Sequence, residues 1–359
     1  MLKFIHAADF HLDSAFAALP PDRAAERRKA LRALPERLAQ AARNWGADLL
    51  LLSGDLFDGP QPYPETVEAL RAALAGIHAP VFLAPGNHDP FTEDSPYARE
   101  PWPENVHIFR SGGMESVPLP ELGVVVHGAA FTAPTREESL LRGFTAPRDG
   151  LAHLGVLHGE LAQDSLYDPL SREDIAASGL AYLALGHVHK RTEPLCFGTT
   201  TVAWPGCPEG RGFDELGDKG FLAGEVSPGE AALQFIPFAR RRYRIMEVDV
   251  TEGDPAETAL AAIPQGWSED VCRIVLTGSP AAPVRPERIE TALAGRFYTL
   301  QVRDKTTARQ ELWERCGEDT LRGLFLQNLR DRCGDDPQSR RLMEQAAAFG
   351  LAAIDDREV

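Results

Sequence analysis

The stretch LLLLSGDLFD, residues 49–58, sets the expected fold class. Its four leucines are too few to span a membrane and are typical of a buried parallel β-strand. A serine and a glycine follow, and then two carboxylates, Asp55 and Asp58. In α/β folds the functional side chains collect on loops at the carboxyl ends of such strands. The stretch therefore predicts a strand that delivers acidic side chains to a site.

The same combination of an apolar strand and a polar loop occurs on both sides of this stretch. We expect strands at about 2–8 and 80–84, and helices over about 23–45 and 64–76. Pro35 should kink or split the first helix, because proline cannot donate a helical hydrogen bond. The alternation predicts a β-α-β-α-β unit whose loops share one edge.

Beyond residue 105 the expected strands become shorter. They lie over 123–127, 151–157, 180–185, 199–203, 221–226 and 231–236. We therefore expect a mixed two-sheet sandwich over residues 1–240. Pro237 and the arginine-rich run 240–244 mark a boundary. After it, a second β-α-β-α-β pattern predicts a smaller α/β domain over 241–305 and a helical tail over 306–359.

The composition restricts the class of protein. Hydrophobic residues at 43%, charged residues at 25% and a mean hydropathy of -0.24 are typical of a globular chain and exclude a disordered one. The formal net charge of -16 disfavours tight, unaided binding to nucleic acid, although bound metal ions would offset part of it. Five cysteines without a C-x-x-C pair and an N-terminus without a signal-peptide pattern predict reduced thiols in a cytoplasmic protein.

Five short segments at predicted strand ends carry metal-ligating residue types. In chain order they are DFH at 9–11, GDLFD at 54–58, GNHD at 86–89, HGE at 158–160 and GHVH at 186–189. Taken alone, DFH, GDLFD and HGE are explained better by a helix cap, a turn or a buried histidine, whereas GNHD is more specific than the Asx turn that could also explain it. Imidazole, carboxylate and amide oxygen together suit Mn²⁺, Fe or Zn. Their joint occurrence in this order, each after a strand, favours a metal site over a purely structural role.

This set of motifs resembles that of the calcineurin-like metallophosphoesterases over about residues 1–205. Within that family, the segments 9–13, 54–58 and 86–89 look like those of bacterial SbcD-type DNA repair nucleases, and the segments 157–159 and 185–191 look like the YhaO branch. The resemblance implies a four-layer α-β-β-α sandwich whose C-terminal α/β domain caps the site. It also implies two Mn²⁺ ions, or Fe or Zn, that activate water for attack on a phosphoester.

The resemblance also implies a role for each matching residue. One ion would be held by Asp9, His11, Asp55 and His189, and the other by Asp55, Asn87, His158 and His187. His88 would protonate the leaving group, and Asp58 would orient His88. We expect Asp13 to support a ligating histidine and Asp89 to stabilise the turn that carries His88. The five other histidines, His6, His78, His107, His127 and His153, are assigned to packing or solvent.

Three functions remain open from the sequence. The resemblance favours a Mn²⁺-dependent DNA repair nuclease, an exonuclease or endonuclease that dimerises and works with a coiled-coil SMC-like ATPase of the SbcC/YhaN type. A phosphatase or small-molecule phosphodiesterase would need the same residues, and a catalytically idle scaffold is the third alternative. The segment 159–174 is expected to border the substrate.

The resemblance also implies that the C-terminal helices dock the ATPase. Their candidate apolar stripe contains Leu321, Leu324, Phe325 and Leu329. An ordinary core helix explains this stripe equally well.

Overall fold

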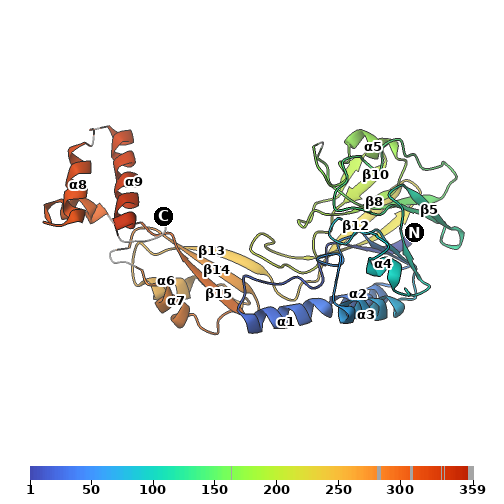
Figure 1. Cartoon of the computed structure of the whole chain (residues 1–359), viewed down its shortest axis with the longest axis horizontal. Coiled ribbons are helices and arrows are strands. Elements are labelled where there is room, and N and C mark those ends of the chain that lie inside the picture. The colour runs from blue at the N-terminus through green and yellow to red at the C-terminus, as the bar shows by residue number, and fades with distance from the viewer. Residues whose placement is uncertain (163, 281–283, 308–309, 333, 335, 355–359) are drawn as a thin grey trace. The chain divides into compact units, whose positions relative to one another are not determined.

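The structure is a computed structural model that describes residues 1–162, 164–280, 284–307, 310–332, 334 and 336–354 (Figure 1). It divides into two compact units, Met1–Arg242 and Tyr243–Val359. Each unit has hydrophobic cores of its own.

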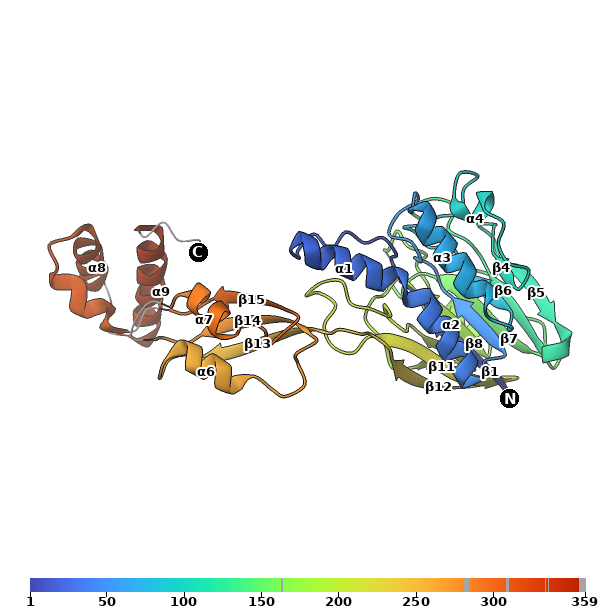
Figure 2. The ribbon, with the colours of Figure 1, turned by 90° about the horizontal axis from the view of Figure 1, so that it is seen from below.

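The first sheet of the first unit has six strands in the order β12-β11-β1-β2-β3-β4. Its parallel strands are β1 (Leu2–Ala7), β2 (Leu49–Leu52), β3 (Val81–Leu83) and β4 (Val106–Ile108), and its antiparallel strands are β11 (Gly220–Ser227) and β12 (Glu230–Pro237). The helices that connect the parallel strands are α1 (Pro21–Arg32), α2 (Leu34–Trp45), α3 (Pro64–Ala75) and the short α4 (Pro96–Arg99). Helices α2 and α3 lie side by side over this sheet (Figure 2). The predicted helix over 23–45 is split at Ala33, two residues before Pro35, as expected.

The second sheet has the order β5-β6-β7-β8-β10-β9. Its strands are β5 (Glu115–Leu119), β6 (Val124–Gly128), β7 (Ala152–His158), β8 (Tyr182–Gly186), β9 (Leu195–Phe197) and β10 (Thr200–Ala203), with η1 (Pro120–Leu122) after β5 and α5 (Arg172–Ala177) after β7. Side chains of both sheets form one core between them, for example Phe4, Leu51, Val126 and Tyr182. The predicted two-sheet α/β sandwich is thus confirmed.

The layer outside the second sheet is less helical than expected. Its core contains Leu140 and Leu141 from the β6–β7 connection, Leu170, and Ile175 of the short α5. Irregular segments and the short α5 therefore cover that face.

The second unit begins with a three-stranded parallel sheet of β13 (Tyr243–Asp249), β14 (Val271–Thr277) and β15 (Thr299–Asp304). Helices α6 (Pro255–Ala262) and α7 (Pro286–Ala292) pack on it around Val248, Ile274 and Ile289. No helix of the described residues is long and apolar enough to cross a membrane. The described cysteines, Cys196, Cys207, Cys272 and Cys316, are free thiols, and Cys333 lies outside the described residues.

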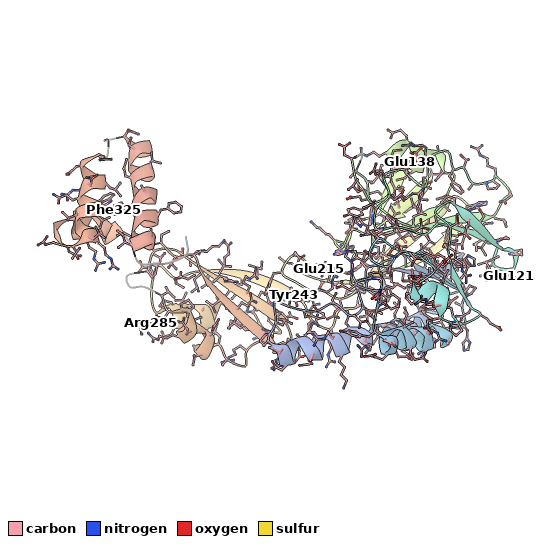
Figure 3. All side chains as sticks on the ribbon, in the orientation of Figure 1. Glu121, Glu138, Glu215, Tyr243, Arg285 and Phe325 are labelled. Carbon is pink, nitrogen blue, oxygen red and sulfur yellow. The ribbon has the colours of Figure 1, made fainter. Side chains whose placement is uncertain are left out.

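The tail contains η2 (Gln310–Gly317), α8 (Leu321–Asp331) and α9 (Pro337–Ile354), with a small core of its own. Phe325, labelled in Figure 3, packs against Gly350 of α9. Leu329 packs on the same core. Leu321 and Leu324, by contrast, are 71% and 58% exposed. The predicted apolar stripe is therefore divided: Phe325 and Leu329 face the core of the tail, and Leu321 and Leu324 form an exposed outer face.

The histidines assigned to packing or solvent lie apart from the metal-ligand groups of the described residues. His78 is exposed, and His107 packs against Phe82 and Phe109. A hydrogen-bonded chain runs from Ser116 through His127 and His153 to Asp149.

His6 is fully buried in the core between the sheets. Its Nδ1 lies 2.7 Å from the Tyr182 hydroxyl and its Nε2 lies 3.1 Å from Ser53 Oγ. Because Ser53 Oγ donates to the Ala184 carbonyl, it accepts from Nε2–H. His6 is therefore satisfied as a neutral ring, and burial lowers its pKa to about 3.

This pKa predicts a loss of stability in mild acid. Between pH 6.5 and about 3 the unfolded chain protonates His6 while the folded chain does not, so the free energy of unfolding falls as pH falls. Between pH 7.5 and 5, wild type should lose about 2 kcal/mol more than His6→Gln in urea denaturation with chelator present. The exposed His78→Gln should behave as wild type. Equal losses in wild type and His6→Gln would contradict the assignment.

Candidate metal centre

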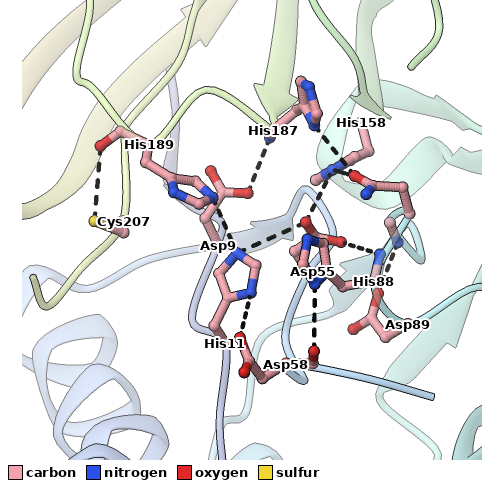
Figure 4. Close-up of polar contacts among 12 residues, drawn as sticks. Asp9, His11, Asp55, Asp58, His88, Asp89, His158, His187, His189 and Cys207 are labelled. Carbon is pink, nitrogen blue, oxygen red and sulfur yellow. Dashed lines mark hydrogen bonds and ion pairs between the residues drawn. The ribbon is translucent and has the colours of Figure 1, made fainter. Parts of the chain in front are cut away.

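The predicted site residues lie at the carboxyl ends of five strands from both sheets (Figure 4). Strand β1 leads to Asp9 and His11, β2 to Asp55 and Asp58, β3 to Asn87 and His88, β7 to His158, and β8 to His187 and His189. The two sheets are packed face to face, so these ends meet at one edge of the sandwich. The structure thus brings all nine predicted residues into one region.

Two glycines allow the loops to come this close. A Cβ at Gly186 would lie 1.8 Å from the Ser53 carbonyl oxygen, and one at Gly86 would lie 2.2 Å from Asp55 Oδ1. Both distances are far shorter than any van der Waals contact. The glycines that open the GNHD and GHVH segments are therefore required by packing at the site.

Four of the predicted ligands have a left-handed backbone. They are Asp9, His11, Asp55 and His187, with φ of 55°, 44°, 50° and 88°. This conformation costs on the order of 1–3 kcal/mol for each residue other than glycine. Main-chain bonds of 3.0 Å from Asp9 N to Gly54 O and from His11 N to Asp55 O offset part of that cost. Such strain is characteristic of a functional site.

Asp9, His11 and His189 form the first ligand group. One ligand atom from each lies within 4.8 Å of the others. His11 Nε2 and His189 Nε2 are only 3.0 Å apart, and His11 Nδ1 lies 3.1 Å from Asp58 Oδ1. Asp9 Oδ2 is buried with no hydrogen-bond partner among the described residues. An acceptor without a donor and two converging imidazole nitrogens fit a cation.

Asp55, His158 and His187 form the second group, which Asn87 joins. His158 Nδ1 lies 2.9 Å from the Ser53 carbonyl and must donate to it, so the lone pair is on Nε2. That Nε2 faces Asn87 Oδ1 at 2.9 Å and Asp55 Oδ2 at 3.3 Å. All three atoms are acceptors. A second cation would satisfy them together.

The electrostatics of the site favour positive charge. Burial lowers the pKa of His158, but the Asp55 and Asp9 carboxylates outweigh it and raise this pKa to about 9. Burial likewise raises the pKa of Asp55, yet His158 and His11 hold it well below its usual range. A proton and a metal ion compete for such a site, and the donor set present suits two borderline divalent ions.

The Asp58 carboxylate does not have the position that we expected. It hydrogen-bonds with His11 and Arg211, and although one of its oxygens lies within 4.8 Å of a His88 ring nitrogen, no hydrogen bond joins it to that ring among the described residues. The contact to His88 comes instead from the Asp58 main chain, whose carbonyl lies 3.3 Å from His88 Nδ1. His88 N donates to Asp55 Oδ1 at 2.9 Å, and its ring is exposed. The carboxylate of Asp58 therefore supports a ligand, and its carbonyl supports His88.

The expectation for Asp13 is wrong, and that for Asp89 is confirmed. The Asp13 carboxylate accepts from Tyr63 N and from Thr66 Oγ1 at the start of α3, and it contacts none of the ligating histidines. The Asp89 carboxylate accepts from Gly86 N, from the main chain of residues 56 and 57 and from the Tyr97 hydroxyl. It therefore ties the loop after β3 to the loop after β2.

Sequence reasoning missed Glu215 and Arg211, which lie in a loop with no strand-end signal. Glu215 Oε1 is 2.8 Å from His189 Nδ1, and Arg211 joins Glu215 to Asp58. Segment 159–174 borders the second group, because Glu160 Oε1 lies 3.7 Å from His187 Nε2 and the Tyr167 ring lies 4.7 Å from the His187 ring.

Comparisons with known proteins agree with this geometry. The sequence profile described as "Calcineurin-like phosphoesterase" matches residues 2–191. The uncharacterized metallophosphoesterase YhaO of Bacillus subtilis is 32% identical over 77% of this chain and 72% of its own. A subunit of the nuclease SbcCD of Rhodobacter capsulatus is 27% identical, covering 67% of this chain and 70% of its own. The DNA double-strand break repair protein Mre11 of Aeropyrum pernix is 30% identical, covering 70% and 65%.

Adding a methyl group at residue 86 should weaken metal binding without unfolding the chain. Gly86→Ala forces its Cβ against Asp55, so Mn²⁺ affinity should fall at least about tenfold while the chain stays folded. Gly59→Ala is the matched control, because its Cβ would have no neighbour within 4 Å. Isothermal titration with Mn²⁺ and a circular dichroism melt measure both effects. Unchanged affinity in Gly86→Ala would contradict the packing argument.

Proposed function

The chain belongs to the calcineurin-like phosphoesterase family, and on that premise we propose that it is a Mn²⁺-dependent DNA nuclease. Family membership makes it a metal-dependent phosphoester hydrolase. The observation that carries the proposal is the pair of ligand groups, Asp9–His11–His189 and Asp55–His158–His187, at one edge of the sandwich. The choice of DNA is supported by two relatives, one named as part of a nuclease and the other as a DNA double-strand break repair protein.

Seven side chains would hold the two ions. They are Asp9, His11, Asp55 and His189 for one ion, and Asp55, Asn87, His158 and His187 for the other. When bound, the ions act as Lewis acids and activate a water molecule for in-line attack on phosphorus. Mn²⁺ is the proposed metal, since imidazole together with oxygen donors disfavours Mg²⁺ alone, and Fe or Zn are alternatives.

His88 is the proposed source of the proton for the leaving group. The Asp58 carbonyl accepts from His88 Nδ1–H, so in the doubly protonated ring the Nε2–H is the proton that would pass to the leaving oxygen, and the ring would return to its neutral form. The bond from His88 N to Asp55 Oδ1 fixes the loop that carries this ring. His88 is exposed, so an entering substrate can reach it.

The second candidate is a phosphatase or small-molecule phosphodiesterase. The net charge of -16 favours it, because a polyanionic duplex is repelled at long range. The exposed Lys190 favours the nuclease instead, because this lysine, next to His189, can contact a phosphate backbone. We also propose that residues 1–240 are the nuclease domain and 241–305 a capping domain that restricts access, in a cytoplasmic protein.

Hydrolysis of DNA tests the proposal directly. End-labelled linear DNA should be degraded with Mn²⁺ and not with chelator, and His88→Asn should lower the rate about 10²–10⁴-fold. His78→Asn, at an exposed position outside the site, is the matched control. If a phosphomonoester or a generic diester is cleaved while DNA stays intact with every metal, the second candidate replaces the nuclease.

We propose that residues 306–359 dock a coiled-coil SMC-like ATPase and that the nuclease is a homodimer. The relative from Rhodobacter capsulatus is named as one part of a multi-subunit nuclease. The tail has large apolar side chains that are mostly exposed: Leu321, Leu324, Leu342 and Phe349 are 71%, 58%, 60% and 59% exposed. An amphipathic helix of the partner fits such a surface.

Acidic substitutions at the exposed leucines of α8 should disrupt docking of the ATPase without changing catalysis. Leu321→Glu combined with Leu324→Glu should abolish co-elution with the ATPase encoded in the same genome, while Mn²⁺-dependent hydrolysis of a generic phosphodiester stays near the wild-type rate. Leu260→Glu, on an exposed leucine of α6, is the control. Co-elution that survives the double substitution would remove the tail from the interface.

A further inference from the structure

Residues 207–219, which we call the strap, form most of the connection from β10 to β11. The strap contacts His189 of the first ligand group. Gly206 has φ of 73°, and a Cβ there would lie 2.7 Å from the His189 carbonyl oxygen. Cys207 N and Lys219 Nζ both donate to this same oxygen, at 3.2 and 2.9 Å. The two ends of the strap therefore hold the main chain of His189.

The middle of the strap holds the side chains. Glu215 is 4% exposed, and its Oε1 lies 2.8 Å from His189 Nδ1 and 2.7 Å from Arg211 Nη2. Arg211 Nη1 donates to Asp58 Oδ1 at 3.2 Å, the same oxygen that lies 3.1 Å from His11 Nδ1. One guanidinium thus joins the two carboxylates that orient His11 and His189.

This arrangement determines which ring nitrogens carry hydrogen. When each Nδ1–H donates to its carboxylate, the Nε2 lone pairs of His11 and His189 face each other across 3.0 Å, ready for a cation. Arg211 Nη2 also lies 3.0 Å from His189 Nδ1. Without the Glu215 carboxylate, that donor would favour the opposite tautomer, whose Nε2–H points at the cation position. Glu215 therefore selects the tautomer of His189 that can bind a metal.

The second ligand group is oriented by other elements. His158 Nδ1 donates to the Ser53 carbonyl at 2.9 Å, and His187 Nδ1 lies 3.1 Å from Asn87 Oδ1. These contacts come from the loops after β2 and β3. The loop after β2 thus contributes to both groups, whereas the contacts of the strap described above are to the first group.

We propose that Arg211 and Glu215 are positioning residues that set the affinity of one metal position, the one at Asp9, His11 and His189. The inference rests on the proposed dinuclear centre. It makes the two positions unequal, because strap residues contact His189 and Asp58 of the first group, whereas the contacts of His158 and His187 come from Ser53 and Asn87, outside the strap. A carboxylate behind a ligating histidine typically changes metal affinity about 10–100-fold.

Metal counting tests this without any turnover assay. The full chain is dialysed against a series of Mn²⁺ concentrations, bound metal is measured by mass spectrometry, and electron paramagnetic resonance distinguishes coupled from isolated Mn²⁺. Wild type should bind two ions per chain with a coupled signal. Glu215→Gln should keep one ion, with an isolated signal, and bind the second about 10–100-fold more weakly.

Two further variants keep the test decisive. Arg211→Lys retains the charge but lacks the fork that joins both carboxylates, so it should weaken the same ion. Asp218→Asn is the matched control, because this exposed strap carboxylate pairs with Arg242 and should leave both ions bound. Circular dichroism melts establish that each variant is folded.

The outcomes separate the two proposals. Two coupled ions at wild-type affinity in Glu215→Gln and Arg211→Lys would overturn the role of the strap while the metal centre stands. Equal weakening of both ions would also overturn it, since the proposed effect is confined to one position. A wild type that binds no Mn²⁺, Fe or Zn would overturn the metal centre itself.

Discussion

The structure of the first unit depends on an excess of hydrogen-bond acceptors at one edge of two packed sheets. Asp55 is almost fully buried, yet it faces the Nε2 lone pair of His158, and Asp9 has a buried oxygen that no described donor reaches. Unpaired acceptors in a dry site cost several kcal/mol unless a positive charge lies among them. The folded unit therefore contains a cluster of buried acceptors whose negative charge only protons or cations can neutralise.

The rest of the first unit supports that edge. The parallel strands β1, β2 and β3 end together, and glycines at 86 and 186 let their loops approach closer than any Cβ would allow. Asp89 ties two of these loops to each other, and the bonds from His187 N to Asp9 and from His158 to Ser53 tie the second sheet to the first. The strained backbone of four ligands is held by these bonds, so the site is preorganised.

The sequence predicts much of this because its signals are local. The leucine run that ends at Gly54 and Asp55 specifies both a strand and the side chain it delivers, and family resemblance adds the grouping of ligands. Asp58 shows the limit of such reasoning. The sequence correctly places this residue at the site, but the motif does not reveal that its main-chain carbonyl contacts His88 and its carboxylate contacts His11. Arg211 reaches Asp58 across 153 residues, and no periodicity encodes such a contact. Asp13 differs from the expectation because a loop carboxylate can equally well bind the start of a following helix, as it does at Tyr63 and Thr66.

Anomalous diffraction from crystals of this protein grown with Mn²⁺ tests the central claim most directly. The account predicts two peaks about 3.5–4 Å apart, one beside Asp9, His11 and His189 and the other beside Asn87, His158 and His187, with Asp55 between them. A single peak, or peaks remote from Asp55, would contradict a dinuclear centre at the edge of the sandwich.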